Sequence, residues 1–179
     1  MFYLVESRDG PPSGQRFKDK LEDDETFDTD FISATPEECQ RWAVERRRHD
    51  LSFHDCIIAI VDARSAKDGT LLMQRYATHN HPFGGYGLLP PEKNVWCDFR
   101  VHVRDAAKAE LALIHVSPNV SYPCWFGNKE RFTDENGVFN VDEADRYSIG
   151  EDEDVRESEI FQRRFQPLPD GMSYSDFEE

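Results

Sequence analysis

Residues 56–61 read Cys-Ile-Ile-Ala-Ile-Val, a continuous apolar run with an aspartate on each side. A run of this length without polar alternation is typical of a strand that is buried on both faces. It therefore predicts the central strand of a sheet. A turn signal follows it, and the next strand is expected over residues 70–76.

A third strand is predicted over residues 95–103, where apolar and polar side chains alternate. Successive side chains of a strand point to opposite faces, so one set is expected to face the core. That set is Val95, Cys97, Phe99, Val101 and Val103.

The clearest helix signal is the segment Thr35-Pro36-Glu37-Glu38. A threonine before a proline, with a glutamate three positions on, is typical of a capping box at a helix N-terminus. The pattern predicts a helix over residues 36–49. A shorter helix is expected over residues 105–111, followed by a strand over residues 113–116.

Together these elements predict an α/β (or α+β) fold with a mixed sheet of about five strands, on which the two helices pack. The remaining expected strands are Phe2–Val5 and a hairpin around Asn136-Gly137. We expect residues 1–141 to form a single globular domain. Residues 142–179 are rich in acids and are expected to be a partly disordered tail, docked by apolar side chains. Those side chains are Phe161, Phe165 and Leu168.

The chain is strongly acidic, with 36 Asp and Glu against 21 Lys and Arg and a net charge of −15 over 179 residues. This charge repels nucleic acid and anionic membranes, and it favours a basic protein partner. The densest acid runs supply the expected partner-binding residues, which are Asp23, Asp24, Glu25, Glu151, Asp152, Glu153 and Asp154. The alternative is that the acidity serves only solubility.

No stretch of the sequence approaches the roughly 20 apolar residues that span a bilayer. The first residues lack the pattern of a signal peptide, and the four cysteines are scattered. We therefore expect a cytoplasmic protein.

The segment His79-Asn80-His81-Pro82 places two imidazoles two positions apart, a spacing that suits a zinc site. It resembles the His-x-His-Pro core of JAMM/RadC-type metalloproteases. That resemblance implies zinc held by His79 and His81, with Glu92 at the position of the third ligand. The chain departs from the family at Leu89, where those enzymes have a serine.

Two further motifs have alternatives. Residues 132–143 have the spacing of a calcium loop, but Phe132 stands where the first carboxylate is needed, so a hairpin is the favoured interpretation. Cys56 or Cys97 would be a nucleophile only with a nearby histidine, and apolar burial favours a structural role for both.

Three functional hypotheses follow. The first is a non-enzymatic interaction or regulatory protein without a cofactor, whose acidic surface binds a basic partner. The second is a zinc-dependent hydrolase that uses His79, His81 and Glu92. The third is a small-molecule enzyme with a pocket beneath the loop at residues 77–93. The sequence does not determine the oligomeric state.

Overall fold

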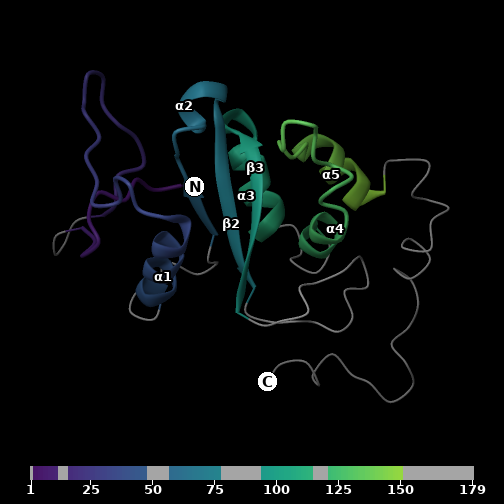
Figure 1. Ribbon diagram of the computed structural model, residues 1–179, viewed down its shortest axis with the longest axis horizontal. Coiled ribbons are helices and arrows are strands. Elements are labelled where there is room, and N and C mark those ends of the chain that lie inside the picture. The colour runs from purple at the N-terminus through teal and green to yellow at the C-terminus, as the bar shows by residue number, and fades with distance from the viewer. Residues whose placement is uncertain (1, 12–15, 48–56, 78–93, 115–120, 151–179) are drawn as a thin grey trace, which may run out of the picture.

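Among the residues that the structure describes, the sheet has three antiparallel strands in the order β1-β2-β3 (Figure 1). They are β1 (Ile57–Ile60), β2 (Thr70–Ala77) and β3 (Val95–His102). The computed structural model describes residues 2–11, 16–47, 57–77, 94–114 and 121–150. Within these residues the α/β class is confirmed, but the sheet is antiparallel instead of mixed and contains three of the about five expected strands.

The central strand is β2, so the prediction of a central position for the apolar run that contains β1 was wrong. β2 pairs with β3 over its whole length and with β1 on its other side. Ile57 and Ala59 pack against the core, whereas Ile58 and Ile60 alternate with them and point to the opposite face. Because both faces of this edge strand meet other parts of the protein, its sequence resembles that of a central strand.

One face of the sheet carries the core. It is covered by α3 (Ala106–Ile114), α4 (Ser121–Gly127) and α5 (Val141–Ile149), whereas α1 (Pro36–Arg47) lies on the side of β1 (Figure 1). The amide of Gln40 on α1 donates to Gln74 on β2 (3.2 Å), on the face opposite the core. Two short helical turns complete the described elements, α2 (Ser65–Asp68) and η1 (Val103–Asp105).

The core-facing side chains of β3 follow the predicted alternation up to Val101. Cys97, Phe99 and Val101 are buried, and Val95 packs against the same cluster. Val103 departs from the prediction, since 54% of it is exposed. The strand ends at His102 and the chain turns into η1, so the period of two no longer applies.

Residues 142–149 belong to the folded unit, although their acid content favoured a tail that starts at 142. They form most of α5, and Val141, Ala144 and Tyr147 are buried in the core. Asn140 accepts a hydrogen bond from the Glu143 amide (3.2 Å) at the helix start. Apolar residues three positions apart outweigh the surrounding acids here. The remainder of the expected tail, with Phe161, Phe165 and Leu168, lies outside the described residues.

Two further expectations change in detail. The short helix is present as α3, but it continues to Ile114, so residues 113 and 114 are helical and not the start of a strand. Near the N-terminus, the expected strand is reduced to one isolated bridge between Leu4 and Lys18.

The capping box of α1 is confirmed. The Thr35 amide donates to the Glu38 carboxylate (2.8 Å), and the Glu38 amide donates to the Thr35 hydroxyl (3.3 Å). Ala43 on this helix is buried. The helix therefore begins where the sequence predicts it, and the described part of it ends at Arg47.

We predict that Thr35→Ala lowers the free energy of unfolding by about 1 kcal/mol, because one N-terminal amide loses its acceptor. Denaturant unfolding at constant slope measures this change. Thr26→Ala is the control, since Thr26 is exposed and lies outside the box. Equal midpoints for the two variants would contradict the prediction.

Candidate functional site

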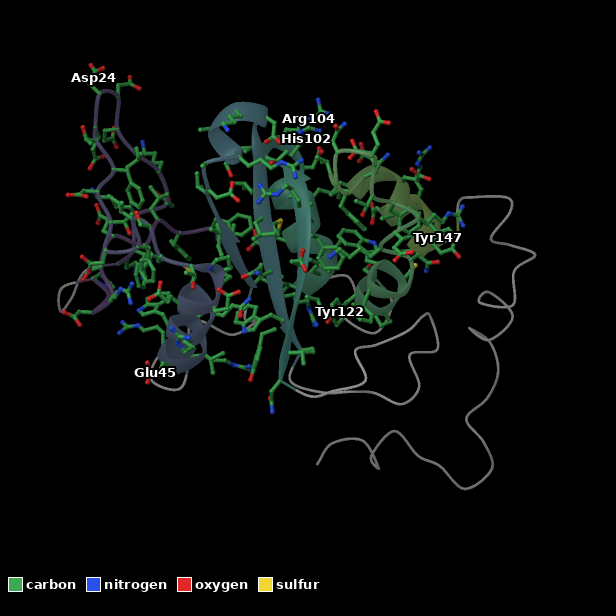
Figure 2. All side chains as sticks on the ribbon, in the orientation of Figure 1. Asp24, Glu45, His102, Arg104, Tyr122 and Tyr147 are labelled. Atoms are coloured by element: carbon green, nitrogen blue, oxygen red, sulfur yellow. The ribbon has the colours of Figure 1, made fainter. Side chains whose placement is uncertain are left out.

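The most acidic described segment is the arm of residues 16–30, which stands apart from the sheet with its tip pointing away from α1 (Figures 1 and 2). Asp24 lies at its tip (Figure 2). A turn forms there because the Glu25 amide donates to the Glu22 carbonyl (3.1 Å) and Asp24 adopts a left-handed φ of 65°. Aspartate tolerates this conformation better than most residues, so the turn presents its acids to solvent.

The base of the arm is fixed to the rest of the protein by side-chain contacts. The Trp42 indole on α1 donates to the Arg8 carbonyl (2.8 Å), and its ring packs edge-on against Phe31 at 5.1 Å between centroids. The Thr29 hydroxyl donates to the Val5 carbonyl (2.7 Å). The arm is thus joined to α1 and to the N-terminal segment at its base.

The three expected binding acids of the arm are not equivalent. Glu25 forms an ion pair with Lys18, which also binds Glu6 at 2.9 Å. The hydrogen bond from Lys18 holds the pKa of Glu25 below its usual range, and the same bond raises the pKa of Lys18. Asp23 and Asp24 are exposed, and their side chains have no ion pair or hydrogen bond with the described residues. These two carboxylates are therefore available to a partner.

The second acid run, Glu151, Asp152, Glu153 and Asp154, lies outside the described residues. Two other acids precede this run in the sequence, Asp142 and Asp145 on α5. Both bind Lys108 of α3, at 2.7 and 3.1 Å. The negative charge of this part of α5 is partly neutralised within the protein, in contrast to the tip of the arm.

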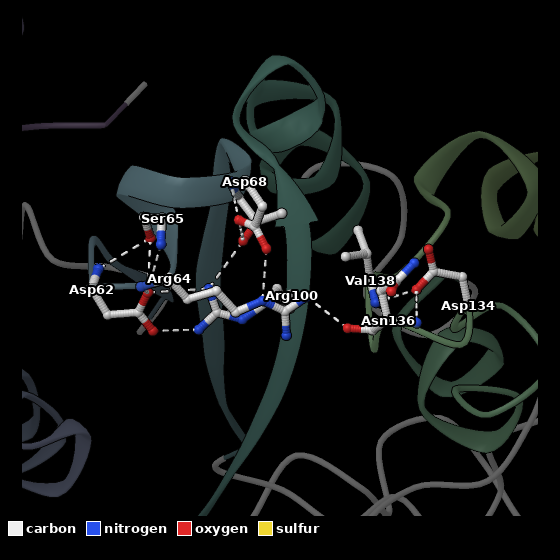
Figure 3. A network of polar contacts seen from close by, with 9 residues as sticks. Asp62, Arg64, Ser65, Asp68, Arg100, Asp134, Asn136 and Val138 are labelled. Carbon is white, nitrogen blue, oxygen red and sulfur yellow. Dashed lines mark hydrogen bonds and ion pairs between the residues drawn. The ribbon is translucent and has the colours of Figure 1, made fainter.

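A second polar cluster surrounds Arg100 on β3 (Figure 3). Its guanidinium forms an ion pair with Asp62 and donates to the Thr70 hydroxyl (3.1 Å). Asp62 also accepts from the amides of Arg64 (3.0 Å) and Ser65 (2.9 Å), which form the start of α2. Because the Arg100 side chain is only 11% exposed and bonded on both nitrogens, it connects β3 to the β1–α2 turn.

The cluster continues through α2 to the loop of residues 128–140 between α4 and α5, called the far loop below. The Thr70 hydroxyl donates to Asp68 (2.6 Å), and Asp68 binds the Arg64 guanidinium (2.7 Å). Arg64 in turn donates to the Asn136 carbonyl at 2.6 Å (Figure 3). Each of these charges has a partner inside the protein. The cluster therefore stabilises the contact of β3 with the β1–α2 turn and the far loop, and it leaves no charged group for a ligand.

The loop around Asn136 does not have the structure of a calcium site. Phe132, at the position of the first ligand, is buried in the core. Asp134 accepts from the amides of Asn136 (2.9 Å) and Val138 (2.8 Å), and these bonds hold its pKa below the usual range. A bridge between Thr133 and Phe139, with Gly137 at a φ of 74°, is consistent with the turn that the sequence favoured.

The sequence also offered a zinc site and a cysteine nucleophile as candidates. His79, His81 and Glu92 lie outside the described residues, as does Cys56. Within the part that the structure describes, no group of three or more His, Cys, Asp and Glu side chains could hold a metal ion.

Cys97 is buried, as the strand pattern predicts. The Tyr122 hydroxyl donates to its sulfur at 3.0 Å. Burial raises the pKa of the Cys97 thiol, and it also raises that of the Tyr122 phenol. A neutral buried thiol is a poor nucleophile, so these contacts support the structural role.

The pairing of Arg100 with Asp62 was not predicted from the sequence. A signal was present, because an aspartate three positions before a serine, directly after a strand, is typical of a capped turn. The neighbouring residues gave no indication that Arg100 binds the other carboxylate oxygen of Asp62. Arg100 is 38 residues away, and only the register of the strands brings the two together.

We predict that Asp62→Asn lowers the free energy of unfolding by about 1–2 kcal/mol at neutral pH, a value reduced by the partial exposure of the carboxylate. Arg100 holds the pKa of Asp62 below its ordinary value of 3.8. The stabilisation is therefore present above that value and is lost as the pH falls below it.

Denaturant unfolding as a function of pH tests this prediction. The variant should lose less stability than the native protein as the pH is lowered from neutral into the acid range. Glu135→Gln, at an exposed position of the far loop, is the control. Parallel pH profiles for Asp62→Asn and the native protein would show that the pair contributes nothing.

Within the described residues, no helix is long and apolar enough to cross a membrane. The chain matches no protein-family model, no curated protein and no solved structure. Its function is therefore inferred from its own residues and their arrangement.

Proposed function

We propose that this chain is a non-enzymatic, cytoplasmic interaction or regulatory protein that binds a basic protein partner through its acidic surface. The observation that carries the proposal is the tip of the arm. Asp23 and Asp24 are both exposed, and among the described residues neither carboxylate has a counter-ion.

The distribution of ion pairs supports this assignment. Elsewhere in the described part of the chain, many acids are bound by cations of the protein itself, as Asp62 is by Arg100 and Asp142 by Lys108. Asp23 and Asp24 are not neutralised in this way by any described residue, although their neighbours Glu22 and Glu25 pair with Lys20 and Lys18. The negative potential of such acids accelerates the encounter with a basic surface and determines which partners are repelled.

The rigid base of the arm supports a binding role as well. Thr29 on one side of the arm bonds to Val5, and Lys18 on the other side bonds to Leu4, so less conformational entropy is lost when a partner binds the tip. An acidic segment that served only solubility would not require such contacts.

We predict that Asp23→Asn combined with Asp24→Asn slows association with a basic partner by roughly 3–10-fold at low ionic strength. A decalysine peptide is the probe, and stopped-flow or surface-based kinetics give the association rate. The difference from the native protein should shrink as salt rises, because salt screens exposed charges.

The matched control is Glu130→Gln combined with Glu135→Gln. It removes the same net charge from exposed positions in the loop between α4 and α5. If the two double variants slow association equally, only the net charge matters and the arm is not a binding site. If neither variant has an effect, the acidity is a solubility device.

A further inference from the structure

We propose that the outer edge of β1 accepts an extended, basic segment of the partner protein as an additional strand of the sheet. This inference rests on the proposed function and deepens it, since it names the conformation and the chemistry of the partner. The two edges of the sheet differ in whether other parts of the protein bond to them.

The edge formed by β3 is closed by the protein itself. The Phe139 amide donates to the Arg100 carbonyl at 2.7 Å, so the segment before α5 bonds to the outside of β3. Lys129 binds Asp98 on the same strand at 3.2 Å. A further strand cannot add there without displacing these contacts.

The same hydrogen bond fixes which groups of β1 face outward. Since the Arg100 carbonyl points away from β2, the residues that alternate with it, such as Phe99, bond to β2. Met73 is the partner of Phe99, so the backbone N–H and C=O groups of Met73 point to β3. The groups of its neighbours Leu72 and Gln74 point the other way, to β1.

The partners of Leu72 and Gln74 on β1 are Ile60 and Ile58. By the same alternation, the backbone N–H and C=O groups of Ile57 and Ala59 point to the outside of the sheet. Within the described residues, no backbone or side-chain group hydrogen-bonds to these two residues from outside. An antiparallel or parallel strand could bond to all four groups.

β1 is short, but it carries none of the charged residues or prolines that usually protect an edge. All four of its residues are apolar, and all are only partly buried. Exposed edges of this kind are templates for strand addition.

The N-terminal segment does not close this edge by hydrogen bonds. The Leu4 amide donates to Lys18 (2.7 Å), and the carbonyls of Val5 and Glu6 accept from residues 29 and 30 of the arm. Its described backbone bonds are thus directed to the arm and not to β1.

The charge around the edge selects a basic occupant. The arm, with seven acidic and three basic residues, lies on the β1 side of the sheet, and Asp24 marks its tip (Figures 1 and 2). α1 lies on the same side and is balanced, with three glutamates and three arginines. A segment lying along β1 would therefore enter the field of the arm's acids. Backbone bonding to β1 would supply affinity, and the arm would supply the preference for lysine and arginine.

The test uses a synthetic peptide that alternates lysine with valine, and a second peptide with the same sequence in which alternate amides are N-methylated. We expect the first to bind saturably and to slow hydrogen exchange at the amides of Ile57 and Ala59. The N-methylated peptide, with equal charge, should bind at least 10-fold more weakly. Binding of both peptides alike, or no binding at millimolar concentration, would overturn the inference.

Ala59→Pro provides the matching change in the protein. Proline removes the outward N–H of residue 59 and leaves the bonds between β1 and β2 intact, so the variant should fold but lose at least 10-fold in peptide affinity. Ala59→Gly is the control, because it also weakens a strand but keeps the N–H. Circular dichroism and the unfolding midpoint establish that both variants fold.

These experiments separate the inference from the proposed function. If peptide binding depends on Asp23 and Asp24 but not on residue 59 or on peptide amides, the acidic surface binds a basic partner without strand addition. Slow exchange at Ile57 and Ala59 in the free protein would mean that the chain covers its own edge, and the inference would be wrong.

Discussion

The packing of aromatic rings around Phe99 is the constraint on which the rest of the structure depends. Phe99 lies in the middle of β3, where its ring meets Phe139 edge-on at 5.0 Å and Trp125 at 6.1 Å between centroids. Phe132 packs in turn against Phe139 and against Tyr147 of α5. Each buried aromatic side chain removes a large apolar area from water, so this cluster provides much of the stabilisation of the fold.

This cluster determines where the two ends of the molecule lie. The Trp125 indole donates to the Ser148 hydroxyl at 3.0 Å, which joins α4 to α5 on the β3 side of the sheet. The polypeptide between these helices then closes the edge of β3. The N-terminal arm and α1 have no part in the cluster and lie at the other edge of the sheet, on the side of β1 (Figure 1).

Local sequence signals predicted individual elements well. The capping box at Thr35 and the alternation around Phe99 depend on neighbouring residues only, and both are confirmed. The order of the strands could not be predicted from such local signals, because an edge strand that is covered on both faces has the same apolar pattern as a central strand. α5 was missed since the acid content of its exposed face obscured the three-residue spacing of Val141, Ala144 and Tyr147.

For the candidate site, the sequence identified the acids of the arm but not their individual states. Glu25 is bound to Lys18, seven residues earlier, and this pairing requires the turn at Asp24. The polar cluster around Arg100 was not predictable, because Arg100 on β3 binds Asp62, which is 38 residues away in the sequence. Composition thus indicates that a surface is acidic, whereas the fold decides which carboxylates remain unpaired.

The most direct test of the arm as a binding surface is a two-dimensional NMR titration of the full chain with decalysine at low ionic strength. We expect chemical-shift changes concentrated in residues 22–30, around Asp23 and Asp24, and small changes along α5, where Lys108 binds Asp142 and Asp145. Shifts spread evenly over the acidic residues, or largest on α5, would contradict the claim that the arm is the binding surface.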